Sequence, residues 1–104
     1  MDPLDAFLEA LRPLLRAHRA RAAYLIGSRA RGAADPESDI DVIIVAESDR
    51  QEVERFRDYL PALLAVPLAV DLFVYTPDEF ERLRAEERPF LVHALDGAKL
   101  IHEG

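Results

Sequence analysis

Residues 22–45 read AAYLIGSRARGAADPESDIDVIIV, and this stretch decides the fold. It consists of a short apolar run, Ala22–Ile26, a turn-rich segment, residues 27–38, and a second apolar run, residues 39–45. Both apolar runs have the length and composition of buried strands. Glycine, proline, aspartate and serine mark the segment between them as a loop with room for one helical turn. The stretch therefore predicts two neighbouring strands joined by a loop.

Helical patterns flank these two strands. Apolar residues at helical spacing predict an amphipathic helix over residues 4–20. Pro13 lies inside it and should kink the helix or split it in two, because proline lacks the amide hydrogen. A second helix is expected after residue 45, with Ser48 or Asp49 as its cap. Its helical period places five apolar side chains inward: Val53, Phe56, Leu60, Leu63 and Leu64.

The last third of the chain adds strands and helices. Residues 68–75 are the stretch most typical of a β-strand. Residues 76–79, Thr-Pro-Asp-Glu, have the pattern of a helix start with a capping box, and Pro89 restarts the helix as a short piece. Residues 98–102 fit a small edge strand. This order predicts an α/β (α+β) fold, in which a small mixed sheet of three to four strands packs with helices in a single domain, residues 1–104.

Composition excludes several classes of site and partner. Without cysteine there is no disulfide or thiolate metal site, so any metal must be held by oxygen or imidazole. The net charge of −7 argues against a general nucleic-acid binder, and no direct nucleic-acid contact is expected. No apolar run approaches the length of a membrane span, and the acidic N-terminus is unlike a signal peptide. A cytoplasmic protein with no membrane partner is the expectation.

Three aspartates lie in predicted strands, where aspartate is unfavourable. Asp39 and Asp41 are two residues apart, so both side chains point to one face while Ile40 and Val42 point to the core. Asp71 interrupts the apolar strand that follows. If the strands are neighbours, the three carboxylates can converge and form a site for two Mg²⁺ ions, with Mn²⁺ as an alternative. By itself, Asp71 could equally be a buried acid paired with an arginine.

The loop before Asp39 has the features of an anion site. Gly27 lets the backbone approach a ligand closely, and Ser28 offers a hydroxyl and an N–H. A helical turn that starts near Arg29 would direct its amides at an anion, and Arg29 and Arg31 could bind phosphate oxygens. Taken alone, a Gly-Ser pair is usually only a turn. The six arginines between residues 10 and 34, with no acid among them, could also form a cationic surface for an acidic partner.

Together, Gly27-Ser28, Gly32 and Ser38-Asp39-Ile40-Asp41-Val42 resemble the signature of the polymerase-beta-type nucleotidyltransferase superfamily. Within it, the chain resembles the MNT (minimal nucleotidyltransferase) proteins, the antitoxin partners of HEPN ribonuclease toxins. This resemblance implies a nucleotidyltransferase fold, Mg²⁺ ligation by Asp39 and Asp41, and Asp71 as the third carboxylate. It implies that Gly27 and Ser28 contact the β- and γ-phosphates of ATP.

Two functions follow as expectations. The first is Mg²⁺-dependent transfer of AMP from ATP to a hydroxyl, that of a tyrosine, of a HEPN toxin encoded nearby. This would make the chain an antitoxin that works in a hetero-oligomer. The alternative is a non-enzymatic antitoxin, or a nucleotide-binding module, that neutralises its partner by forming a complex.

Overall fold

The computed structural model describes residues 2–104, and within them the sheet has four strands. The strands are β1 (Ala22–Ile26), β2 (Ile40–Val45), β3 (Val70–Tyr75) and β4 (Lys99–Glu103), in the order β3-β2-β1-β4. β2 and β3 are parallel, whereas β1 is antiparallel to both β2 and β4. The predicted mixed sheet is confirmed, as is the small edge strand at the end of the chain.

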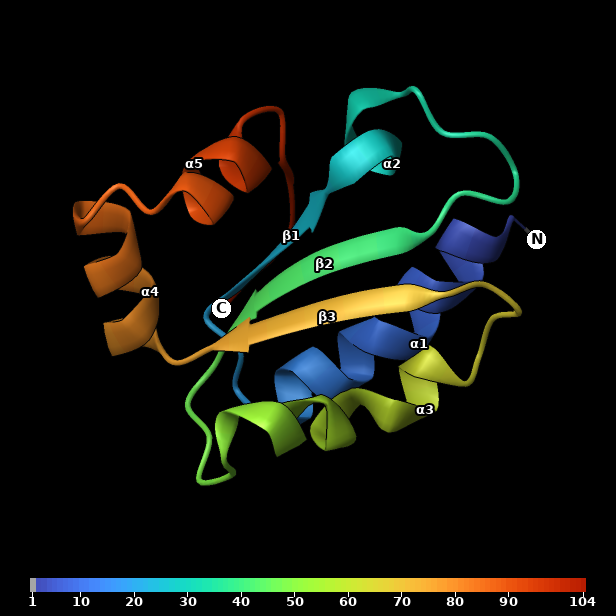
Figure 1. The fold of residues 1–104 in the computed structure, drawn as a ribbon. Coiled ribbons are helices and arrows are strands. Elements are labelled where there is room, and N and C mark those ends of the chain that lie inside the picture. Colours follow the sequence, from blue (N-terminus) through green and yellow to red (C-terminus); the bar gives the residue numbers. More distant parts are fainter. Residues whose placement is uncertain (1) are drawn as a thin grey trace.

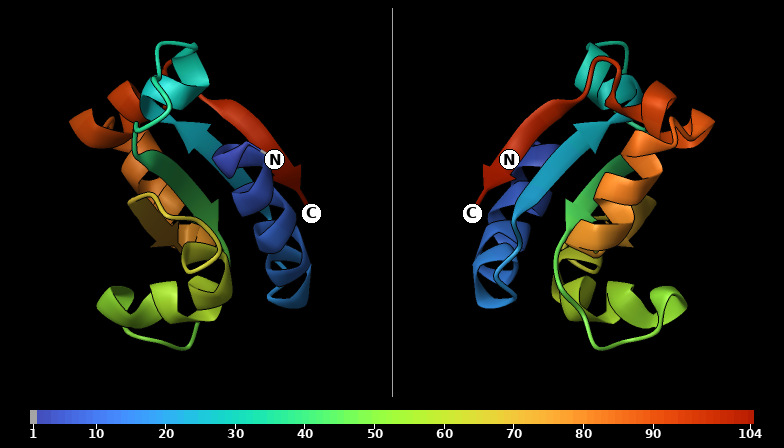
Figure 2. Two further views of the ribbon diagram at one scale, coloured as in Figure 1. Left: turned by 90° about the vertical axis from the view of Figure 1, so that its right-hand side faces the viewer. Right: turned by 90° about the vertical axis from the view of Figure 1, so that its left-hand side faces the viewer.

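Helices cover both faces of this sheet (Figure 1). One face packs against α1 (Pro3–Ala17), the 3₁₀-helix η1 (Glu52–Tyr59) and α3 (Leu60–Leu63), and the other against α4 (Pro77–Ala85) and α5 (Pro89–Leu95). The short helix α2 (Gly27–Arg31) continues directly from β1. Figure 2 shows the two helical layers on either side of the strands. Over residues 2–104, none of the helices combines the length and the apolar character that crossing a bilayer requires.

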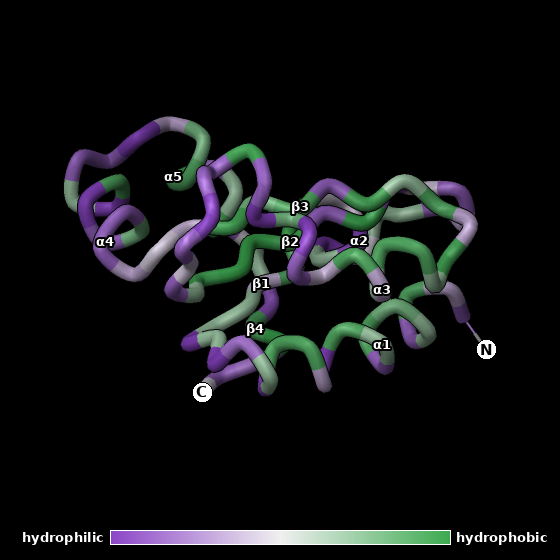
Figure 3. The backbone as a smooth tube through the Cα atoms, turned by 90° about the horizontal axis from the view of Figure 1, so that it is seen from below, coloured by the Kyte–Doolittle hydropathy of each residue, from purple (hydrophilic) through white to green (hydrophobic). Residues whose placement is uncertain are grey.

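Alternation along β2 builds the two cores. Ile40, Val42 and Ile44 are fully buried toward α1, and Ile43 and Val45 point to the α4–α5 side. Figure 3 shows β2 as a hydrophobic segment at the centre of the molecule. Because both faces of this strand are covered, its side chains fix the register of the strands on either side.

The first helix is not split by Pro13, contrary to one form of the prediction. α1 runs without interruption from Pro3 to Ala17. Pro13 is exposed, and so is Glu9, the residue four positions earlier whose carbonyl loses a helical hydrogen bond. That carbonyl can bond to water, so the helix tolerates the proline. α1 ends three residues before the predicted boundary, and Arg19 then adopts a left-handed backbone with φ of 54°.

The prediction for the inward face of the second helix is confirmed only at Leu63, which is partly buried against the core, and is wrong at the other four residues. Val53 and Leu64 are each 76% exposed, and Phe56 and Leu60 are also exposed. The residues that η1 buries are instead Arg55 and Tyr59. Neither Ser48 nor Asp49 caps this helix: its first flanking residue is Gln51, without a side-chain cap, and the Ser48 hydroxyl accepts the Arg50 amide instead.

A buried ion pair explains why Arg55 faces inward. Its Nη1 donates to Oε1 of Glu79 at 2.6 Å, and its Nη2 donates to Oε2 at 3.2 Å. Nη1 also donates to the Val74 carbonyl at 3.2 Å. Glu79 completes the predicted capping box with Thr76, which is confirmed. One guanidinium thus joins η1, β3 and the start of α4, a role that the apolar periodicity of η1 does not reveal.

Replacing Arg55 with alanine is expected to lower the free energy of unfolding by about 3 kcal/mol, because Glu79 would keep a partly buried charge without its partner. Arg57→Ala is the matched control on the same helix, since Arg57 pairs with Glu54 at the surface and its loss should change stability by less than about 1 kcal/mol. Urea unfolding of both variants measures the difference. Equal losses would show that the Arg55 pair is no stronger than a surface pair.

The same ion pair should make stability fall in acid. Hydrogen bonding from Arg55 lowers the pKa of Glu79 from 4.5 to about 2. A carboxyl whose pKa is depressed by folding stabilises the folded state above its ordinary pKa, and this contribution is lost as pH falls toward the depressed value. Between pH 4.5 and about 2, wild type should therefore lose more stability than Glu79→Gln. Thermal unfolding across that range is the measurement, and parallel curves would contradict the prediction.

Candidate functional site

The parallel register of β2 and β3 sets two of the predicted aspartates side by side. Asp41 is the Cα partner of Asp71. Both share the α4–α5 face of the sheet with Ile43 and Phe73, as the alternation in the sequence predicts. Asp39 lies immediately before β2 and is exposed. The three aspartates are thus placed at one end of the sheet, where β1 ends and both β2 and β3 begin.

Electrostatics at this end of the sheet disfavour a second negative charge. Burial raises the pKa of Asp41, and the neighbouring carboxylates of Asp71 and Asp39 raise it further. All of these causes act in the same direction, so no cationic side chain within residues 2–104 offsets the repulsion. An arginine partner for Asp71 was the alternative from sequence, and no hydrogen bond or ion pair between them is present within residues 2–104.

Carboxylate oxygens are ligands suited to Mg²⁺ or Mn²⁺, and the juxtaposed, uncompensated pair of Asp41 and Asp71 fits such a cation. However, no cluster of three histidine, cysteine, aspartate or glutamate side chains is arranged to hold a metal in the part of the chain that the structure describes. The charge of Asp39 therefore acts on Asp41, but Asp39 does not complete a three-ligand metal site with Asp41 and Asp71. The three-carboxylate metal site stays a prediction.

Gly27 lies against Asp41. Its φ is 73°, and a Cβ added to it would stand 2.6 Å from Oδ2 of Asp41. A side chain at position 27 is thus excluded both by the left-handed backbone and by the carboxylate. The helical turn α2 begins at Gly27, two residues earlier than predicted, so Ser28 lies within its first turn.

Arg29 is bonded to the loop that leads into β2. Its Nε and Nη2 donate to the Ser38 carbonyl at 3.0 and 2.8 Å, and Nη2 also reaches the Pro36 carbonyl at 3.4 Å. Asp35 closes the same loop, because its carboxylate accepts the Glu37 amide at 2.8 Å. Arg29 therefore fixes the residue before Asp39. Sequence reasoning missed this positioning role, since a carbonyl acceptor leaves no signal in the residue pattern.

Arg31 points elsewhere. Its Nη2 donates to the carbonyls of His93 and Asp96, each at 3.4 Å, at the end of α5. Its side chain also packs against Gly97. The structure thus does not bring Arg29 and Arg31 together on one anion, and their assignment to phosphate stays a prediction.

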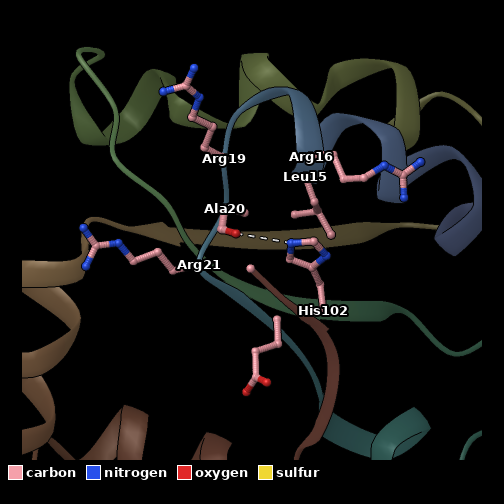
Figure 4. A pocket seen from close by; sticks show the side chains of 8 residues that line it. Leu15, Arg16, Arg19, Ala20, Arg21 and His102 are labelled. Carbon is pink, nitrogen blue, oxygen red and sulfur yellow. Dashed lines mark hydrogen bonds between the residues drawn. The ribbon is translucent and has the colours of Figure 1, made fainter.

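The arginines of the N-terminal segment do not form one cationic surface either. Arg16, Arg19 and Arg21 line a cavity of about 400 Å³ at the opposite end of β1 from Gly27. Figure 4 shows their guanidinium groups pointing outward in different directions, while Nε2 of His102 bonds to the Ala20 carbonyl at 3.2 Å. The cavity therefore lacks a convergent set of cations.

The sequence profile of the nucleotidyltransferase domain matches residues 4–70, which include Gly27, Ser28, Asp39 and Asp41. The chain belongs to this family. The match covers more than half of the chain and confirms the superfamily, the fold and the enzyme class that the sequence predicted. No curated protein matches the chain.

Solved structures share the fold of this nucleotidyltransferase domain. One is a toxin–antitoxin complex crystallised with AMP-PNP, with 21% identity, coverage of 93% of this chain and 73% of that chain, and a TM-score of 0.67. Another is the complex of a tri-AMPylated Shewanella oneidensis HEPN toxin with its MNT antitoxin, with 20% identity, coverage of 100% and 74%, and a TM-score of 0.62. At this level of identity, these similarities concern the fold.

Two glycines with the same backbone conformation test the contact between Gly27 and Asp41. Gly27 and Gly32 both have a φ of 73°, but a Cβ at position 32 meets open space. Alanine at either position should cost about 1–2 kcal/mol through the left-handed backbone. Only Gly27→Ala should also displace the Asp41 carboxylate, so if Mg²⁺ and ATP bind at this carboxylate and raise the melting temperature, Gly27→Ala should abolish that rise and Gly32→Ala should keep it. Thermal unfolding with and without both ligands measures this, and equal ligand effects in the two variants would refute it.

Proposed function

We propose that this chain transfers AMP from ATP to a hydroxyl group, a tyrosine of a HEPN-type partner, and thereby acts as an antitoxin. The observation that carries the proposal is the in-register pair of Asp41 and Asp71 beside Gly27. Family membership supports the reaction class. The fold is also shared with a chain from a complex that contains AMP-PNP and with one from a complex that contains an AMPylated toxin.

The reaction is a displacement at the α-phosphorus of ATP. The acceptor oxygen forms a bond to this phosphorus, the bond to the oxygen bridging the α- and β-phosphates breaks, and pyrophosphate leaves. The hydroxyl proton goes to the carboxylate of Asp71, which is exposed on β3. Most of the chemistry is positioning and charge neutralisation, so a rigid sheet edge that carries the carboxylates suits it.

Asp39, Asp41 and Asp71 are the residues that would hold two Mg²⁺ ions, or Mn²⁺. When bound, divalent ions neutralise the triphosphate and lower the pKa of the acceptor hydroxyl. We assign Gly27 and Ser28 to the β- and γ-phosphates, because the turn of α2 places their backbone next to Asp41. Arg29 acts in this proposal by holding the loop before Asp39.

The alternative is neutralisation by complex formation alone. It would be supported by a cationic surface on the arginine-rich segment, residues 10–34, but these arginines do not form one. Arg29 and Arg31 donate to backbone carbonyls, and the arginines around the cavity of Figure 4 diverge. A juxtaposed carboxylate pair would also be an unfavourable feature for a surface that only binds. We therefore place the enzyme first. We further propose that the chain is a single cytoplasmic domain and that it acts within a hetero-oligomer. It would make no direct contact with nucleic acid.

Incubation with α-labelled ATP, Mg²⁺ and the HEPN-type protein encoded in the adjacent reading frame should transfer label to that protein. Asp39→Asn and Asp41→Asn should each reduce the transfer rate by about a hundredfold or more, because each removes a charge needed at the triphosphate. Mass spectrometry of the labelled protein should find AMP on a tyrosine.

Asp49→Asn is the control variant, since Asp49 is an exposed aspartate in the loop after β2 and should leave the rate unchanged. An unlabelled partner, or label that persists in the Asp39 and Asp41 variants, would exclude this reaction. If the double variant still neutralises the toxin while transfer is lost, complex formation is sufficient and the alternative is preferred.

A further inference from the structure

The outer edge of β3 has main-chain groups that are not used by the sheet. The carbonyl of Ala69 accepts the amide of Ile40 in β2, and that of Tyr75 accepts the amide of Ala46, the residue after β2. Because residues of a parallel strand alternate in the side to which their main-chain groups point, Val70, Leu72 and Val74 turn theirs away from β2. The Val74 carbonyl accepts Arg55, which agrees with this direction. Within residues 2–104, the main-chain groups of Val70 and Leu72 that point away from β2 have no main-chain hydrogen-bond partner.

A groove follows this edge and reaches the candidate active site. It has a volume of about 290 Å³ and is lined by apolar side chains from η1, α3 and β3, together with Asp71. Phe56 and Leu63 form the side next to η1 and α3. On the other face of the sheet, the rings of Phe73 and the exposed Phe90 pack in a tilted arrangement, with 4.9 Å between their centroids. In Figure 2, β3 lies at one edge of the sheet, the edge opposite β4.

The two edges of the sheet differ in how they are protected. β4 carries Lys99, and its pairing with β1 has a register irregularity, both of which discourage another strand from adding there. β3 reads Val-Asp-Leu-Phe-Val-Tyr from residue 70 to 75, with no lysine or proline and a regular register. An open, regular and apolar edge of this kind accepts an extended chain.

We propose that the acceptor segment of the partner protein binds as an extended strand along the outer edge of β3, pairing with the main chain of Val70 and Leu72. This inference rests on the proposed function and identifies how its acceptor is recognised. Side chains opposite each other on paired strands point to the same face. The residue opposite Asp71 therefore places its hydroxyl on the face of the carboxylates, and its neighbours place apolar side chains against Phe56 and Leu63.

The negative charge of this chain limits which residues the docking segment can contain. The chain carries a net charge of −7, and the carboxylates of Asp39, Asp41 and Asp71 lie at the end of the edge where β3 begins. An acidic segment would be repelled there. The occupant is accordingly a neutral or basic stretch, with a hydroxyl-bearing residue between two apolar ones.

Amide hydrogen exchange, resolved to single residues, tests the docking without relying on turnover. In the complex of the full chain with the HEPN-type protein, exchange at Val70 and Leu72 should slow by about tenfold or more relative to the free chain. Asp71 and Phe73, whose amides face β2, are internal controls and should change little. Unchanged exchange at Val70 and Leu72 in the complex would overturn the proposal. Slowing in the free chain as its own concentration rises would overturn it too, because the occupant would then be a second copy.

A matched pair of variants gives a second readout. Phe56→Ala should raise the KM for the partner protein by about tenfold and leave the KM for ATP unchanged, because it removes one wall of the groove. Leu64→Ala removes an exposed apolar side chain outside the groove and should change neither value. Equal effects of the two variants would count against the groove.

These outcomes separate the docking from the reaction. Slowed exchange at Val70 and Leu72 without any label transfer would reject the nucleotidyl transfer and leave the interface in place. Label transfer without slowed exchange would reject the interface and leave the transfer in place.

Discussion

The parallel pairing of β2 with β3 forces the carboxylates of Asp41 and Asp71 into adjacent positions, and the rest of the structure has to hold that pair in place. Like charges opposite each other on neighbouring strands cost up to about 1 kcal/mol. Burying one large aliphatic side chain contributes about 1.5–3 kcal/mol, and Ile40, Val42 and Ile44 are all fully buried on the opposite face of β2. The apolar face thus outweighs the repulsion. The strands can present two negative charges at a fixed spacing, which a flexible loop could not do.

The antiparallel strand β1 completes this arrangement from the other side. Its last residue, Ile26, is the partner of Asp41, so the chain leaves the sheet next to the carboxylate. Only glycine fits at position 27, directly after β1, since a Cβ would overlap the carboxylate oxygen of Asp41. Arg29 then bonds to the Ser38 carbonyl and fixes the return into β2. The Gly-Ser turn and the Asp-x-Asp strand are therefore coupled by geometry as well as by any ligand they share.

The sequence predicted what depends on periodicity and local stereochemistry. The strands, their faces, the capping box at Thr76 and the placement of Asp41 beside Asp71 follow from alternation and turn chemistry, and the structure agrees. The failures involve long side chains whose partners are distant in sequence. Arg55 is buried because Glu79, 24 residues away, pairs with it, and the apolar residues of η1 are displaced outward as a result. Arg31 likewise bonds to carbonyls 62 and 65 residues later, which no local pattern indicates.

The exposed residues of η1 and the open edge of β3 are connected features. An edge strand without lysine, proline or a bulge invites unwanted pairing, and proteins normally protect such edges. Here the ion pair of Arg55 holds η1 against the far end of β3, and its carbonyl bond occupies the edge at Val74 only. Within residues 2–104, Val70 and Leu72, the two positions that flank Asp71, have no main-chain partner on the outer side of β3. For the proposed transfer to a partner protein, a segment of that protein must reach the carboxylates. In this chain, the unprotected part of the edge coincides with the part where such a segment has to lie.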